Sequence, residues 1–301
     1  MKSNRITGYS NITGVGKWNT GATPGSNEWL ITLSNGGNNN IPNFTVEVGS
    51  TRYTAVATTS LTLGTWYHIA GVREGTTIKI YVNGVLEGSL TDAGITNIND
   101  VPGRKVMLGK IDGFAGYTNM EMDELRIWGE ARSLAQISGN MNCEIPSSAA
   151  NLLANYHFNQ GVGNNPNPGI NTLTDISGNG YDGSLINFGL MVTTSNWVTP
   201  GSPASGNACK VHNITQNTYF SSIQAAIGDL QTANGDVISV AAGTYTEIGQ
   251  IVINKNLTIV GEDKLTTIIK PDGDTPSGDA WILQTQQLHL IWKKVTFGWF
   301  S

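Results

Sequence analysis

From about residue 5 to residue 130 the chain alternates apolar and polar positions with a period of two, which predicts one strand after another. The pattern is clearest in TWYHIAGVREGTTIKIYVNGVLEGSL, where Ile78, Ile80 and Val82 point to one face. Asn83-Gly84 supplies the positive-φ residues of a two-residue turn within this segment. These features predict a sandwich of antiparallel strands.

A change of composition near residue 200 predicts a domain boundary. The sandwich is followed by EARSLAQISGNMN, which we expect to form a one- or two-turn helix ended by Gly139, and then by loops dense in Asn, Gly and Pro. NWVTPGSPASGNAC has the composition of a linker. We therefore expect a first domain over residues 1–200, a linker over 201–212 and a second domain over 213–301.

The second domain follows a different pattern, which begins with a capping helix predicted at about 220–233. Its apolar face would hold Phe220, Ile223, Ile227 and Leu230. Ser221 or Ser222 would be the N-cap, with Gly235 beyond the end. Short apolar strands follow, and those at 237–240 and 257–260 repeat at a spacing of 20, which indicates stacked coils rather than hairpins.

Composition narrows the classes of function. Charged residues make up 13% of the chain and its net charge is −5, without the basic stripe that nucleic-acid binding requires. No apolar run approaches the roughly 20 residues that span a bilayer. The first residues, MKSNRITGYSN, lack the apolar core of a secretory signal. Cys143 and Cys209 lie at no metal-binding spacing, so they form either a disulfide or two free thiols.

Segments of the chain resemble two protein families. LGTWYHIAGVREGTTIKIYVNGVLEGS, MDELRIWGEARSLAQI and DISGNGYDGSL resemble the laminin-G-like, concanavalin-A-like jelly roll of bacterial secreted and cell-surface proteins. SIQAAIGDLQTANGDVISVAAGTYTE and INKNLTIVGE resemble the start of a right-handed, pectin-lyase-like β-helix whose first coil a helix caps. The resemblances imply an all-β chain, a jelly-roll sandwich followed by a short helix-capped parallel β-helix. The usual first strands and later coils are not matched, so we expect a fragment of a larger secreted or surface protein.

The acidic pair Asp123-Glu124 is the first candidate for chemistry. Period-two alternation places the two carboxylates on opposite faces, which is wrong for an acid–base pair flanking a glycosidic bond. Retaining glucanases of this fold carry Glu-x-Asp-x-x-Glu, but Arg126 stands in the last position here. We expect Glu124 and Arg126 to form a same-face ion pair of little energetic weight.

The resemblance implies that Asp123 ligates a structural Ca²⁺, together with backbone carbonyls of the first strand. The alternative is an aspartate hydrogen-bonded to backbone near a strand end. The loop DISGNGYDG gathers Asp175, Asn179 and Asp182 among glycines without the spacing of an EF-hand, which favours a structural loop over a second calcium site.

Aromatic side chains near loops are the candidates for glycan binding, because sugar-binding sandwiches use aromatic platforms surrounded by hydrogen-bonding groups. The candidates are Trp18, Trp29, Tyr53 and Tyr117. The alternative for each is packing, as we expect for Trp66 and Trp128, which lie in apolar strands.

The resulting hypothesis is an extracellular carbohydrate-binding or adhesion module without its own catalytic centre. A fragment of a polysaccharide hydrolase or lyase and a structural spacer of a surface adhesin are the alternatives. Aromatic and apolar residues near the end of the chain also predict self-association through the residues after about 235, or packing of this region onto the sandwich. These residues are Val295, Phe297, Trp299 and Phe300.

Overall fold

The structure is a computed structural model that describes residues 1–4, 13–19, 21, 23–34, 40–113, 117–191, 196–247, 249–272, 282–284 and 289–297. The chain forms two compact units. The first contains Met1–Leu134 and Asn151–Ser202, and the second contains Ala135–Ala150 and Pro203–Ser301. The chain therefore enters the second unit, returns to the first and enters the second again.

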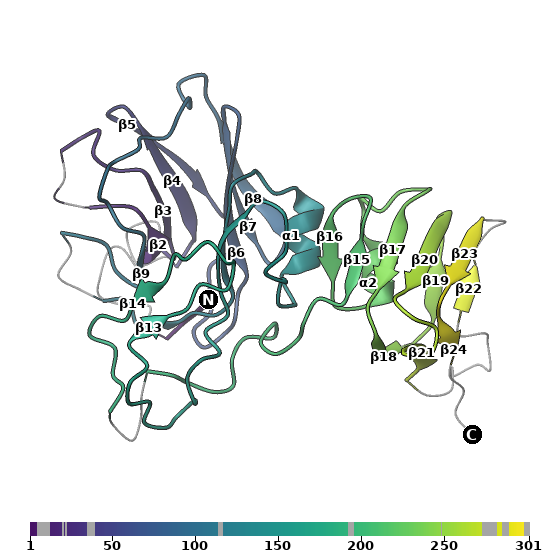
Figure 1. The fold of residues 1–301 in the computed structure, drawn as a ribbon. Helices are drawn as coiled ribbons and strands as arrows, with labels where there is room; N and C mark the ends of the chain where they lie inside the picture. The colour runs from purple at the N-terminus through teal and green to yellow at the C-terminus, as the bar shows by residue number, and fades with distance from the viewer. Residues whose placement is uncertain are drawn as a thin grey trace. The chain divides into compact units, whose positions relative to one another are not determined.

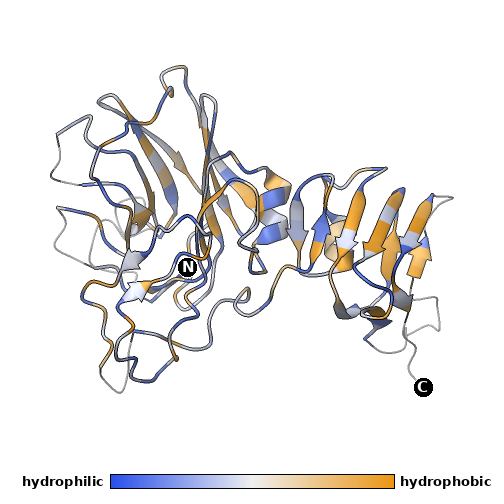
Figure 2. Cartoon of the chain, in the orientation of Figure 1, coloured by the Kyte–Doolittle hydropathy of each residue, from blue (hydrophilic) through white to orange (hydrophobic). Residues whose placement is uncertain are grey.

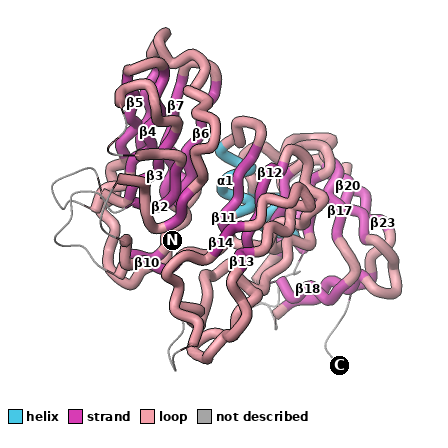
Figure 3. The backbone as a smooth tube through the Cα atoms, turned by 60° about the vertical axis from the view of Figure 1, so that its left-hand side comes forward, coloured by secondary structure: helices cyan, strands magenta, loops and turns pink. Residues whose placement is uncertain are grey.

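The first unit is an antiparallel jelly-roll sandwich (Figures 1 and 3). Its larger sheet has the order β5-β4-β3-β2-β9. These strands are β2 (Thr13–Gly16), β3 (Trp29–Thr32), β4 (Asn43–Val48), β5 (Thr51–Val56) and β9 (Met107–Leu108). The second sheet contains β6 (Ile69–Glu74), β7 (Thr77–Val82) and β8 (Val85–Thr91).

Three two-stranded pairs complete the first unit. They are β1 (Lys2–Ser3) with β10 (Met120–Glu121), β11 (Leu125–Trp128) with β12 (Leu152–Tyr156), and β13 (Thr172–Leu173) with β14 (Gly183–Ser184). Figure 3 shows β11 and β12 side by side, although 23 residues separate them in the sequence (152 minus 128, less one).

The core of the sandwich lies between the two main sheets. Phe44 and Val46 of β4 pack against Ile78, Ile80 and Val82 of β7, all of them at most 5% exposed. This confirms the inward face predicted for β7. The predicted Asn83-Gly84 turn is also present, with φ 48° at the asparagine and φ 76° at the glycine.

The carboxylate of Glu87 in β8 joins the edges of the two sheets. It accepts hydrogen bonds from the backbone N–H groups of Thr58 and Thr59 at 3.0 and 2.8 Å, and from both hydroxyls at 3.2 and 2.6 Å. Burial alone would raise the pKa of Glu87, but these hydrogen bonds outweigh it and hold the pKa below its usual value. The edge strands are thereby tied together.

The second unit is a stack of parallel coils that follows an antiparallel hairpin (Figure 1). Three ladders join each coil to the next, in the orders β17-β20-β23, β18-β21-β24 and β19-β22. The hairpin is β15 (Val211–Asn213) and β16 (Thr218–Phe220). The coil strands are β17 (Val237–Val240), β18 (Gly243–Glu247), β19 (Ile251–Ile253), β20 (Leu257–Gly261), β21 (Thr267–Pro271), β22 (Ile282–Gln284), β23 (Leu290–Lys293) and β24 (Thr296–Phe297).

The register between coils corrects the repeat read from the sequence. Ile238 pairs with Ile259, a spacing of 21 rather than 20 (259 minus 238). Both side chains are fully buried, and a shift of the register by one residue would turn the buried side chains of one strand outward. Figure 2 shows the resulting apolar strands β17, β20 and β23 in orange.

The capping helix is shorter than predicted. Helix α2 (Ile223–Gly228) has Ser222 as its N-cap, one of the two expected residues. Phe220 belongs to β16, and Leu230 is 89% exposed rather than part of a buried helical face. The helix ends early because the Lys255 ammonium donates hydrogen bonds to the carbonyls of Ile227 and Asp229 at 2.8 and 2.6 Å. These backbone carbonyls at the end of the helix therefore have a partner outside it.

Helix α1 (Leu134–Asn140), all but its first residue, packs within the second unit. It runs past Gly139, where we expected it to end. Glycine is needed at this position because a Cβ would lie only 2.6 Å from the Phe220 ring. Asn140 accepts the backbone N–H of Tyr219 in β16 at 3.1 Å, and a disulfide joins Cys143 to Cys209. Helix α1 therefore covers the edge strand β16, and the disulfide anchors the segment directly before β15.

No helix among the described residues is long and apolar enough to cross a bilayer. At the far end of the stack, Val295 and Phe297 pack against the buried core cluster. Trp299 and Phe300 lie outside the described residues. Self-association through this segment stays a prediction.

Candidate functional site

The structure separates the four candidate aromatic residues instead of gathering them. Trp29 of β3 and Tyr53 of β5 face inward, and both pack against the buried core of the sandwich. Their register explains the placement, because each lies opposite Val46 on a neighbouring strand and shares its inward face. These two rings stabilise the sandwich interior.

Trp18 lies on the outer face of the larger sheet, where it is covered. Its side chain packs with Leu30 and Ile111 and is 6% exposed. The Arg52 guanidinium lies over the indole at 4.9 Å from the ring centroid. A sugar could reach this ring only after Arg52 moved aside.

Arg52 is itself held by Glu47, a fully buried carboxylate at the centre of a polar cluster. Arg52 Nε donates to Glu47 at 3.0 Å, and the backbone N–H groups of Gly25 and Asn27 donate at 2.9 and 3.0 Å. Burial opposes ionisation of Glu47, but these donors outweigh it and hold its pKa below the usual value. The cluster therefore anchors the loop before β3 and fixes Arg52 over Trp18.

Tyr117 is the candidate whose ring faces solvent. It is 57% exposed, and its hydroxyl accepts a hydrogen bond from the Asn187 amide at 2.6 Å. The Lys110 ammonium lies 4.6 Å from the ring centroid. An exposed ring that is fixed by an amide and flanked by a cation can offer an apolar face and hydrogen-bonding groups to the same ligand.

Sequence reasoning did not identify Asn187 or Lys110. Asn187 is 70 residues from Tyr117 in the chain, and nothing in its local pattern links it to that ring. Its positive φ of 53° marks a turn, which is common for asparagine and carries no sign of ligand binding.

Asp123, the candidate calcium ligand, precedes β11 and binds backbone donors. Its Oδ1 accepts the N–H of Glu124 at 3.0 Å, and its Oδ2 accepts the N–H of Ser202 at 2.7 Å. A hard cation needs several oxygen ligands, and Asp123 belongs to no cluster of three metal-ligating side chains among the described residues. These two hydrogen bonds are those of a loop-anchoring carboxylate, and calcium ligation by Asp123 stays a prediction.

Glu124 pairs with Arg126, as the sequence predicted. The Oε2–Nη2 distance is 3.0 Å, but the side chains are only 7% and 8% exposed. The pair is therefore buried, and removing one partner would leave a desolvated charge, while its net energetic weight stays a prediction. Glu124 also has φ 51°, an unfavourable conformation for a residue with a Cβ.

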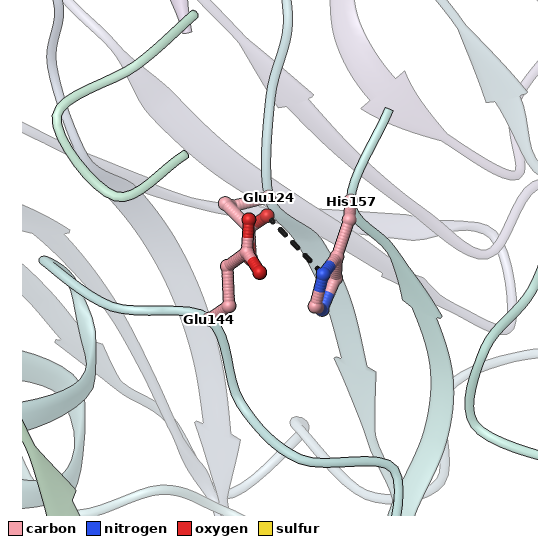
Figure 4. Close-up of side chains that lie close together, drawn as sticks. All are labelled: Glu124, Glu144 and His157. Carbon is pink, nitrogen blue, oxygen red and sulfur yellow. Dashed lines mark ion pairs between the residues drawn. The ribbon is translucent and has the colours of Figure 1, made fainter. Parts of the chain in front are cut away.

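Two histidines lie near this pair. The His157 imidazole faces Glu124, with Nδ1 3.9 Å from Oε1 (Figure 4). Burial, together with the nearby Arg126 charge, lowers the pKa of His68 to about 3, so this imidazole is neutral at physiological pH. The arrangement is a polar cluster around Arg126 of β11, with Glu124 directly before that strand and His157 directly after β12.

The loop DISGNGYDG is organised by one buried carboxylate. Asp175 accepts the backbone N–H groups of Asn155, Ser177 and Tyr181 at 2.9, 2.9 and 3.0 Å, and the Ser177 hydroxyl at 2.8 Å. Asp182 accepts the N–H of Asp175 at 2.8 Å. The oxygens of Asp175 are thus occupied by protein donors, which is the role of a structural loop.

Residues 2–138 match the family model of the concanavalin A-like lectin/glucanases superfamily. A protein from Bacteroides ovatus, provisionally assigned as carbohydrate-binding, aligns with a TM-score of 0.46 and 20% identity over 61% of this chain and 49% of that one.

A second solved structure, an S-layer domain-containing protein from Clostridium thermocellum, aligns with a TM-score of 0.22 and 21% identity over 44% of this chain and 64% of that one. Less than two thirds of either protein is therefore covered. A search of curated proteins finds no match. Residues 2–138, slightly less than half of the chain, are therefore similar to the concanavalin A-like lectin/glucanases superfamily, and the sandwich topology fits this similarity.

Proposed function

We propose that the first unit binds a glycan on the exposed ring of Tyr117. The observation that carries the proposal is that this ring is exposed and also fixed, by Asn187 at its hydroxyl and Lys110 beside its face. Sugars present apolar C–H faces rimmed by hydroxyls, which match an aromatic face with an amide and an ammonium at its rim. The lectin-type domain around the ring supports this reading.

We further propose that the protein works outside the cytoplasm, on a cell surface or in secreted form. The Cys143–Cys209 disulfide supports this location, because cytoplasmic thiols are kept reduced.

Binding to a glycan array, followed by titration of the best ligand, tests the proposed site. Tyr117→Ala should weaken binding by roughly tenfold, the loss typical of one aromatic contact. Tyr181→Ala is the matched control, because Tyr181 is 61% exposed in the same unit. Equal losses from the two substitutions, or unchanged binding by Tyr117→Ala, would refute the proposal.

A further inference from the structure

We infer that the glycan recognised at Tyr117 is acidic, and that Lys110 binds its carboxylate or sulfate. This inference rests on the proposed function and names the class of glycan for the same site. It is carried by the placement of Lys110, by the ion pairs that three of the other four lysines of the first unit form, and by the hydrogen-bonding groups that remain available around the ring.

The backbone holds Lys110 beside the ring. The N–H of Gly109, directly after β9, donates to the carbonyl of Gly14 at 3.0 Å, and the N–H of Thr118 donates back to the carbonyl of Gly109 at 2.8 Å. Ile111, the residue after Lys110, is 1% exposed and packs in a buried cluster. With Ile111 buried and Gly109 bonded to β2, Lys110 is fixed at the surface next to Tyr117.

Lys110 forms no ion pair with any residue that the structure describes. The first unit has five lysines, and three of them form ion pairs at 2.6–2.7 Å with glutamates: Lys2, Lys17 and Lys79. Lys105 and Lys110 have no ion pair within the described part of the chain. Of these two, Lys110 is the one whose ammonium lies against an exposed aromatic ring.

The groups around the ring favour a ligand rich in acceptors. The Tyr117 hydroxyl accepts the Asn187 amide, which leaves its own hydrogen to donate outward. The Lys110 ammonium offers up to three N–H donors on a flexible stem. Its cation–π contact at an exposed ring is weaker than a charge-assisted hydrogen bond, so an anion on a bound sugar can draw the ammonium from the ring.

Matched polymers that differ only in charge test the inference. Polygalacturonate is compared with its methyl ester, and dextran sulfate with dextran, which separates carboxylate from sulfate. At low salt the wild-type protein should prefer at least one acidic polymer by about tenfold. The preference should weaken as salt is added, because screening shortens the range of the charge.

Three variants assign the preference to Lys110. Lys110→Gln should reduce the preference for the acidic polymer below about threefold, and Lys110→Arg should retain it. Lys105→Gln, at the other unpaired lysine, should behave as wild type. Equal wild-type binding of neutral and acidic polymers, or a preference that survives in Lys110→Gln, overturns the inference and leaves the proposed function standing. If no polymer binds, or if Tyr117→Ala binds as wild type, the proposed function fails as well.

Discussion

Replacing Asp175 by asparagine should strongly destabilise the first unit, although the two side chains have nearly the same shape. The carboxylate accepts four hydrogen bonds, two on each oxygen. Asparagine has one acceptor oxygen, so its NH₂ group must face donors in either orientation. Only the Ser177 hydroxyl among these donors can turn to accept a hydrogen bond.

The expected loss follows from these contacts. A hydrogen bond to a charged group contributes about 1.5–3 kcal/mol, so losing two of them in a site that is 7% exposed should cost about 3 kcal/mol or more. Asp182→Asn is the matched control. Asp182 is exposed and accepts the single N–H of Asp175, which asparagine can still accept through its own oxygen, so its cost should stay below about 1 kcal/mol.

Urea unfolding gives the free energies, and hydrogen exchange of peptides covering 152–156 and 175–182 localises the change. The pH dependence supplies a second measurement. Burial of Asp175 opposes its ionisation, but its hydrogen bonds outweigh burial and lower its folded-state pKa. The wild-type advantage should therefore be complete above about pH 4 and shrink as pH falls through the lower folded pKa. A cost for Asp175→Asn no larger than that of Asp182→Asn would refute the reasoning.

Three further predictions concern single features. Gly139→Ala should lower the melting temperature of the second unit, because the added Cβ would lie 2.6 Å from the Phe220 ring. Gly228→Ala is the control and should not lower it, because the nearest heavy atom to its Cβ is 3.9 Å away. Equal effects of the two substitutions would exclude the clash. Reducing the Cys143–Cys209 disulfide, which spans 66 residues, should cost about 4 kcal/mol by chain entropy, measured by denaturation with and without reductant. If Asp123 ligates calcium, millimolar Ca²⁺ should raise the melting temperature of wild type only, and a full shift in Asp123→Asn would exclude it.

The parts of the fold that were predicted correctly depend on local patterns. The inward face of β7 follows from strict alternation, and the Asn83-Gly84 turn from the conformations that this pair tolerates. Ser222 caps α2 through a local contact, because its hydroxyl accepts the backbone N–H of Ala225, three residues later, at 3.1 Å. Each of these features is decided within a few residues.

The errors arose where a distant group decides the outcome. Helix α2 ends where Lys255, 28 residues after Ile227, donates to its last carbonyls. The Phe220 ring explains why a glycine lies inside α1. The exposure of the candidate aromatics was likewise decided by partners, because Arg52 covers Trp18 and Asn187 fixes Tyr117. A single sequence does not reveal these pairings.

The path of the chain also determines how it would carry mechanical tension. Because Cys143 is bonded to Cys209, a pull applied along the chain from both sides passes through the sulfur atoms and bypasses residues 144–208. That bypassed segment includes β12 to β14 and the Asp175 loop of the first unit. On a surface exposed to flow, these elements would be spared direct load until the disulfide was reduced, whereas the coils after Cys209 would bear the full force.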